Sequence, residues 1–146
     1  MSVLPEFIPD AARLSKIFAS AAAPTFFLGA VAGFVSLMSG RLAAVTERAR
    51  NLNAIDENDP KRAHLKADLV RLRRRASFLH RGMVSALLGG ICATVLLAVL
   101  FMTEFIGLQY AYGAGFLFVC ATGFLGVALY HFMREAMIGY GEADAE

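Results

Sequence analysis

Three long stretches of this chain carry no Asp, Glu, Lys or Arg. They run between Lys16 and Arg41, from Gly82 to Thr103, and from Phe105 to Met133. Each stretch exceeds the roughly 20 apolar residues that cross a hydrocarbon core about 30 Å thick, at about 1.5 Å rise per residue. A soluble domain distributes its charges over every surface element, so this pattern predicts three transmembrane helices, at about 17–38, 83–102 and 108–132.

Basic residues concentrate between the first two predicted spans. Of the 14 Lys and Arg residues, 11 lie between Ser39 and Arg81, and none lies in the connection at 103–107. Cytoplasmic loops of membrane proteins carry the excess of Lys and Arg. We therefore predict that the segment 39–82 and the C-terminus are cytoplasmic and that the N-terminus is periplasmic, although Arg13 and Lys16 oppose this orientation weakly.

Helical periodicity continues from the first span into the basic segment. Apolar residues recur every three or four positions from Leu42 to Ile55, and a second series runs from Leu65 through Leu79 to Ala86, across the start of the second span. The sequence thus predicts an all-α fold. Residues 1–146 form one membrane domain with three transmembrane helices, and a coiled-coil-like antiparallel hairpin at about 39–82 is continuous with spans one and two.

The turn of the predicted hairpin is marked by Asp59 and Pro60. The residue before a proline avoids helical angles, Asp accepts bonds from free N–H groups at a helix start, and proline tolerates the first helical position. Asp59 is therefore the predicted N-cap of the second helix.

A turn near residue 58 also predicts a register for the two helices of the hairpin. Antiparallel pairing would bring Arg48 close to Asp68 and Glu47 close to Arg71. Exposed ion pairs of this kind are worth roughly 0.2–1 kcal/mol each, so they would set the register more than the stability.

The arginines that precede the second span have two interpretations. Basic residues beside anionic lipid headgroups anchor the topology, at about 1 kcal/mol each, whereas a dense basic patch also suits nucleic acid or an acidic partner. Neither interleaved aromatic residues nor a nucleic-acid motif accompanies them, so contact with lipid or a partner is favoured and nucleic-acid binding is ranked last. The residues are Arg71, Arg73, Arg74, Arg75 and Arg81.

Small residues recur at four-residue spacing in the predicted spans. Lipid gives helices little drive to associate, so small residues mark places where helices approach closely. Packing within the chain explains such faces, but three helices leave room for a further interface. The predicted helix-packing residues are Gly29, Gly33, Ser85, Gly89, Gly115 and Gly126.

Pro24, Thr25 and Glu104 are candidates for a kink or a pore. Pro24 lacks an N–H and predicts a kink in the first span, and the hydroxyl of Thr25 can bond a carbonyl one turn back. Copies of Glu104 around an axis would form an acidic ring at a pore mouth. The simpler interpretations are packing shape for the proline and an ordinary turn carboxylate for Glu104.

Patterns of catalytic or metal-binding residues are absent from the sequence. It contains no Ser/His/Asp set, phosphate loop or metal-ligand spacing, and Cys92 and Cys120 stand alone. We therefore expect no catalytic residue, cofactor or metal. The leading hypothesis is a non-enzymatic membrane protein that self-associates or joins a membrane complex. The alternative is a homo-oligomeric ion channel with the hairpin as a cytoplasmic vestibule.

Several of these segments together resemble an uncharacterised bacterial membrane family, domain-of-unknown-function family 2721. The resemblance rests on the small residues before Pro24, Arg41-Leu42 at the end of the first span, the run at 47–52 (Glu-Arg-Ala-Arg-Asn-Leu), the run at 72–75 (Leu-Arg-Arg-Arg), and the third span. Where this chain has Glu47 the family pattern has aspartate, which keeps the charge. The resemblance implies a bacterial inner-membrane location and this layout, and it implies no activity.

Overall fold

Three helices make up almost all of the structure. The computed structural model describes residues 11–55, 65–66, 68–106 and 111–143. Helix α1 spans Ala11–Asn53, α2 spans Asp68–Ile106 and α3 spans Ala111–Ala143. The predicted all-α class is confirmed.

All three helices are long and apolar enough to cross a membrane. Each contains one of the predicted spans, apart from residues 108–110 of the third, which lie outside the described residues. The chain is therefore a multi-pass membrane protein. Helix α3 continues well past the predicted end of its span at residue 132, and this extension carries the site described below.

Charged residues stand at the two helix ends that flank the connection between α1 and α2. Arg50 lies in the last turn of α1 and Asp68 in the first turn of α2, and both charges complement the helix dipole. After α1, the N–H of Ala54 bonds the carbonyl of Arg50 at 3.1 Å. The predicted N-cap at Asp59 lies outside the described residues, and α2 itself begins at Asp68.

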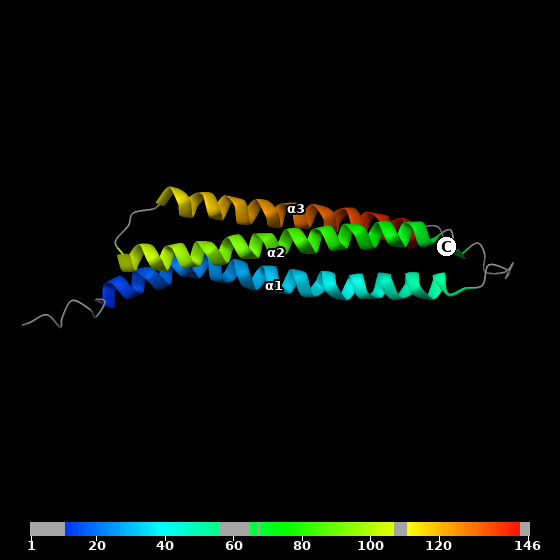
Figure 1. Ribbon diagram of the computed structural model, residues 1–146, viewed down its shortest axis with the longest axis horizontal. Coiled ribbons are helices and arrows are strands. Elements are labelled where there is room, and N and C mark those ends of the chain that lie inside the picture. The colour runs from blue at the N-terminus through cyan, green and yellow to red at the C-terminus, as the bar shows by residue number, and fades with distance from the viewer. Residues whose placement is uncertain (1–10, 56–64, 67, 107–110, 144–146) are drawn as a thin grey trace, which may run out of the picture.

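Helix α2 lies between the other two helices. It packs along both α1 and α3, whereas α1 and α3 contact each other only locally (Figure 1). The C-terminal half of α1 runs beside the N-terminal half of α2. This flat arrangement leaves a large part of α1 and of α3 without a neighbour among the described residues.

Buried residues recur every seven positions in all three helices. A seven-residue repeat is shorter than two full α-helical turns, and it gives helices the left-handed supercoil of coiled coils. One cluster joins Met38 and Val45 of α1 to Leu72 and Leu79 of α2, and a second brings together Val31, Ala86 and Ala128. The repeat comprises Pro24, Val31, Met38 and Val45 in α1, Leu72, Leu79, Ala86 and Ala93 in α2, and Ala121, Ala128 and Glu135 in α3.

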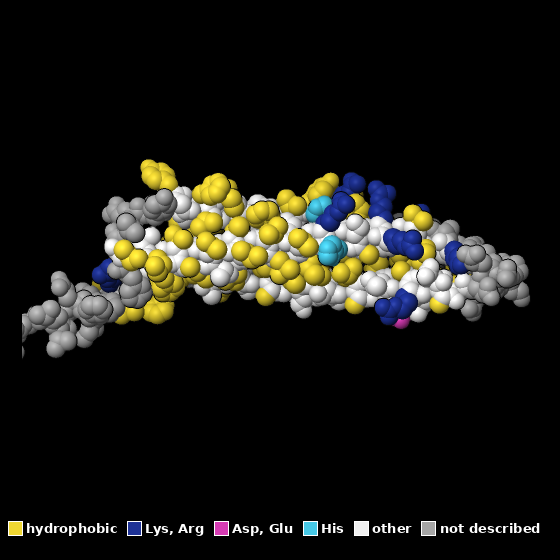
Figure 2. All heavy atoms as spheres, in the orientation of Figure 1, with side chains coloured by type: hydrophobic (Ala, Val, Ile, Leu, Met, Phe, Trp, Pro, Cys, Tyr) yellow, Lys and Arg dark blue, Asp and Glu magenta, His cyan; other side chains and the backbone are white. Residues whose placement is uncertain are grey.

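Apolar and basic side chains separate along the long axis of the molecule. In the view of Figure 2, hydrophobic side chains cover the half that holds the start of α1 and the end of α2, and most Lys and Arg side chains gather over the other half. The helices therefore continue from an apolar zone into a basic one without interruption.

Candidate functional site

Glu135 of α3 occupies a position that the seven-residue repeat otherwise gives to apolar residues. Its side chain is fully buried. Its Oε1 accepts hydrogen bonds from Arg75 of α2, at 3.1 Å from Nε and 2.9 Å from Nη2. Its Oε2 lies 3.4 Å from Nη2 of Arg41 on α1. Each helix thus contributes one charged side chain to a single group, which we call the Arg–Glu–Arg triad.

The surroundings of the triad hold its two arginines in place. A Cβ atom on Gly139, one turn beyond Glu135, would lie 3.0 Å from Nη2 of Arg75, so the absent side chain makes room for that guanidinium. The guanidinium of Arg41 lies 5.1 Å from the ring centroid of Phe132, which meets Phe34 of α1 edge-on at 5.6 Å. These contacts join α1 to α3 at the level of the triad.

Burial of the Glu135 carboxylate carries an electrostatic free-energy cost. Taking a carboxylate out of water costs several kcal/mol unless charges and hydrogen bonds compensate for it. Arg75 is the main partner, because its side chain is only 12% exposed and donates two hydrogen bonds to Oε1. Arg41 is 38% exposed and contributes an ion pair to Oε2, which accepts no hydrogen bond from the described residues. The arrangement joins all three helices through one carboxylate.

Four of the five arginines predicted to contact lipid or a partner are exposed. The exception is Arg75, whose side chain points inward to Glu135. Residues close to Arg75 in the sequence do not reveal this difference, since the carboxylate that holds Arg75 lies 60 residues further along the chain. The exposed members are Arg71, Arg73, Arg74 and Arg81.

The charged residues predicted to set the hairpin register do not meet across the helices. Glu47 pairs with Arg50 on its own helix at 3.4 Å. Among the described residues, neither Arg48 with Asp68 nor Glu47 with Arg71 forms an ion pair or hydrogen bond. Residues three apart lie on the same face of a helix, so Arg50 is placed to pair with Glu47 within α1.

The small residues predicted to pack helices divide into two groups. Ser85 donates a hydrogen bond from Oγ to the carbonyl of Phe124 at 2.7 Å, and a Cβ on Gly89 would lie 3.0 Å from the carbonyl oxygen of Ala121. These two residues line the contact between α2 and α3. A Cβ on any of the others would meet no atom within 4 Å, and these residues are Gly29, Gly33, Gly115 and Gly126.

Replacing Ser85 with alanine is expected to destabilise the α2–α3 contact by about 0.6 kcal/mol, the average for a hydrogen bond between helices in a bilayer. Thermal unfolding of the detergent-solubilised protein would measure this loss. Thr122→Ala is the control, because the Thr122 hydroxyl donates to carbonyls of its own helix, those of Phe118 and Val119, at 3.0 Å. Equal effects of the two substitutions would contradict a role for Ser85 between helices.

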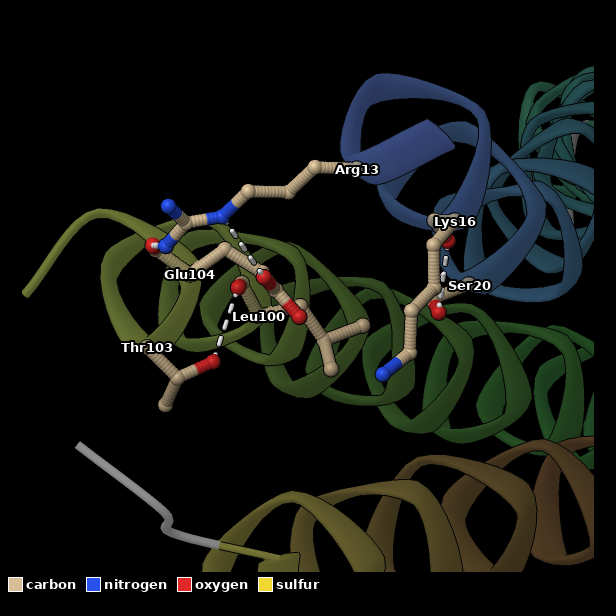
Figure 3. Close-up of polar contacts among 6 residues, drawn as sticks. All are labelled: Arg13, Lys16, Ser20, Leu100, Thr103 and Glu104. Carbon is tan, nitrogen blue, oxygen red and sulfur yellow. Dashed lines mark hydrogen bonds and ion pairs between the residues drawn. The ribbon is translucent and has the colours of Figure 1, made fainter. Parts of the chain in front are cut away.

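The candidate kink and pore residues lie toward the other end of the molecule. Pro24 is buried within α1, whose N-terminal end is inclined to the rest of the helix (Figure 1), and the Thr25 hydroxyl donates to the carbonyl of Ala21 at 2.7 Å. Glu104 of α2 faces Arg13 of α1, with 3.7 Å between Oε2 and Nε, and Arg13 also donates to the Glu104 carbonyl (Figure 3). The carboxylate therefore has a cation from its own chain beside it.

Metal-binding geometry is not found among the residues that the structure describes. They contain no group of three His, Cys, Asp or Glu side chains arranged to hold an ion. Cys92 and Cys120 are free and partly buried.

Comparison with known proteins places the chain in one family. A family model described as "Protein of unknown function (DUF2721)" matches residues 21–144, which confirms the resemblance seen in the sequence. No curated protein and no solved structure matches the chain.

Proposed function

We propose that this chain, which belongs to the DUF2721 family of proteins of unknown function, is a non-enzymatic integral membrane protein that self-associates within the bilayer. The observation that carries the proposal is a face of α1 made of small residues, which lies away from every other described helix. It comprises Gly29, Gly33, Ser36 and Gly40.

The position of this small-residue face follows from helix geometry. At about 100° per residue, the four residues fall on one side of α1, and the buried series from Pro24 to Val45 falls on the opposite side, against α2. A Cβ on Gly29, Gly33 or Gly40 would meet no atom within 4 Å. Packing against the part of the chain that the structure describes therefore does not account for the small-residue face.

A second copy of the chain is a suitable partner for this face. Small residues four apart let two helix backbones approach closely, and in lipid such packing drives helix association where the hydrophobic effect does not. Because α2 occupies only the opposite side of α1, two α1 helices can meet without disturbing the core. The Arg–Glu–Arg triad supports this role by holding the three helices of each copy in one register.

The orientation belongs to the same proposal. We place the protein in the bacterial inner membrane with a periplasmic N-terminus, and with the segment 39–82 as a cytoplasmic helical hairpin that contacts lipid or a protein partner. The Lys and Arg excess of this segment supports the orientation. The side-by-side halves of α1 and α2 and the basic zone in Figure 2 agree with it.

Substitution of Gly33 by leucine is expected to reduce self-association by about tenfold or more, because a branched side chain keeps the two α1 backbones apart. The test uses a protein whose two native cysteines are replaced by alanine and whose Ser36 is replaced by cysteine. Oxidative cross-linking in native membranes then measures how often two α1 helices meet. Gly115→Leu, at an open position on α3, is the matched control and should leave cross-linking unchanged.

The mass of the detergent-purified protein then gives the number of copies in the assembly. A dimer that Gly33→Leu converts to a monomer supports the proposal. A protein that is monomeric in detergent and does not cross-link in membranes contradicts it. A closed ring of four or more copies that conducts ions in liposomes would favour the channel instead, although the pairing of Glu104 with Arg13 weakens the case for an acidic ring at its mouth.

A further inference from the structure

A pocket of about 250 Å³ lies between α2 and α3, next to the Arg–Glu–Arg triad. Arg74 of α2 lines it together with Arg134, Met137 and Ile138 of α3. Arg74 precedes Arg75 in the sequence and Arg134 precedes Glu135, so the pocket occupies the outer side of the same helix contact whose inner side holds the triad.

One aromatic ring holds both guanidinium groups of the pocket. The Cζ atoms of Arg74 and Arg134 each lie 5.9 Å from the ring centroid of Phe78. Attraction of a cation to the face of an aromatic ring offsets part of the repulsion between two like charges. Phe78 therefore keeps two positive charges together beside one cavity.

The positive charge of the pocket is not neutralised by the side chains that the structure describes. Neither Arg74 nor Arg134 forms an ion pair with any of them. Glu135, the acidic residue next in sequence, points the other way and is occupied by Arg75 and Arg41. Guanidinium groups bind phosphate through paired N–H donors, so two of them beside a cavity suit an anionic phosphate group.

The pocket also lies at the depth of lipid headgroups. Arg134 is the first charged residue after the third apolar stretch, and Arg74 precedes the second stretch by about two helical turns, or roughly 12 Å. Both guanidinium groups lie against the ring of Phe78, which precedes the second stretch by about 6 Å, and the headgroup layer extends about 5–7 Å beyond the hydrocarbon on each side. Met137 and Ile138, one turn further from the apolar stretch than Arg134, make the rest of the pocket wall apolar.

We propose that Arg74 and Arg134 bind the phosphate group of an anionic phospholipid headgroup in this pocket. The chemistry that the pocket recognises is an anionic phosphate, and the position at the membrane surface identifies a lipid as its source. This proposal rests on the part of the proposed function in which the chain contacts lipid, and it names the site of that contact. It does not depend on self-association. A monomeric protein with a working lipid pocket would contradict only the self-association.

The test measures thermal unfolding of the full chain in detergent with three probes. These are short-chain phosphatidylglycerol, short-chain phosphatidylcholine and inorganic phosphate. We expect phosphatidylglycerol to raise the unfolding temperature most, because the choline cation of phosphatidylcholine would face two arginines. The double substitution Arg74→Gln with Arg134→Gln should weaken phosphatidylglycerol binding by about tenfold or more.

The double substitution Arg48→Gln with Arg50→Gln is the matched control, since it removes the same charge from exposed positions of α1 outside the pocket. It should leave phosphatidylglycerol binding almost unchanged. Native mass spectrometry, counting phosphatidylglycerol molecules that remain on the purified protein, gives a second readout that does not depend on stability.

Three results would overturn the lipid pocket. Equal loss of binding in the two double variants would mean that diffuse charge attracts the lipid. Equal shifts with phosphatidylglycerol and phosphatidylcholine would mean that the anionic charge is not recognised. A full shift with inorganic phosphate alone would assign the pocket to a soluble phosphate compound in place of a lipid.

Discussion

Replacing Arg75 with glutamine is expected to destabilise the protein by about 3–5 kcal/mol, because it leaves a buried carboxylate without its main partner. Glu135 is fully buried, and both hydrogen bonds to its Oε1 come from Arg75. Arg41 cannot take over this role, since it is part-exposed and lies 3.4 Å from the other oxygen. For a chain of this size the loss corresponds to a fall of about 10–16 °C in unfolding temperature.

Thermal unfolding in detergent, followed by circular dichroism and by the thiol reactivity of Cys92 and Cys120, measures the effect. Arg73→Gln is the control, because Arg73 is an exposed arginine on the same helix and its loss should change stability by less than about 0.5 kcal/mol. If the two variants unfold at the same temperature, the triad does not clamp the helices.

A double substitution separates charge from packing in the triad. Removing both partners of a buried ion pair is often close to neutral, whereas removing one leaves an uncompensated charge. Arg75→Met combined with Glu135→Met should therefore be more stable than Arg75→Gln alone. The remaining arginine, Arg41, keeps its contact with the ring of Phe132 and its access to water.

The membrane-spanning helices could be predicted from sequence because the length of an uncharged stretch can be read directly along the chain. A charge inside a hydrocarbon core is costly, so long uncharged stretches identify spans even when the contacts between helices are unknown. The continuity of α1 past Met38 was likewise visible, because Leu42 and Val45 keep the helical spacing of the span. Both inferences needed only neighbouring residues.

The triad could not be predicted in this way, because it depends on contacts between distant segments. With the third span predicted to end near residue 132, Glu135 lies outside every predicted helix, and Arg75 is grouped with the arginines predicted to contact lipid or a partner. The available signal was the spacing of Ala121, Ala128 and Glu135, which is seven residues and matches the buried repeat of the other helices. That spacing becomes informative only once α3 is known to continue to Ala143.

The small residues show a related limit of sequence information. Gly33 and Gly89 both belong to patterns of small residues four apart, yet only Gly89 contacts another helix of its own chain. Which side of a helix faces a neighbour is decided by all the residues around the helix, and in α1 they put Val31, Met38 and Val45 on the buried side, opposite Gly33. The pattern therefore identifies faces suited to close approach, and the fold decides whether the neighbour comes from the same chain.

Replacing Gly89 with leucine is expected to destabilise the protein by about 1–3 kcal/mol, because the side chain would push α2 away from α3. A Cβ at this position would lie 3.0 Å from the carbonyl oxygen of Ala121 and 3.4 Å from Cβ of Phe124. Gly82 has a closer neighbour, the Met38 methyl at 2.5 Å, but that atom ends a flexible side chain and can move. A backbone carbonyl cannot move without its helix.

Gly126→Leu is the matched control for Gly89→Leu. A Cβ on Gly126 meets no atom within 4 Å, and leucine is a better helix former than glycine by close to 1 kcal/mol, so this variant should be as stable as the parent or slightly more stable. Comparing the thermal unfolding of the two variants as monomers separates contact between α2 and α3 from helix propensity. If Gly89→Leu were as stable as Gly126→Leu, the close approach of α2 to the Ala121 carbonyl would be contradicted. The same result would remove the geometric basis for placing Arg75 beside Glu135, since one α2–α3 contact carries both.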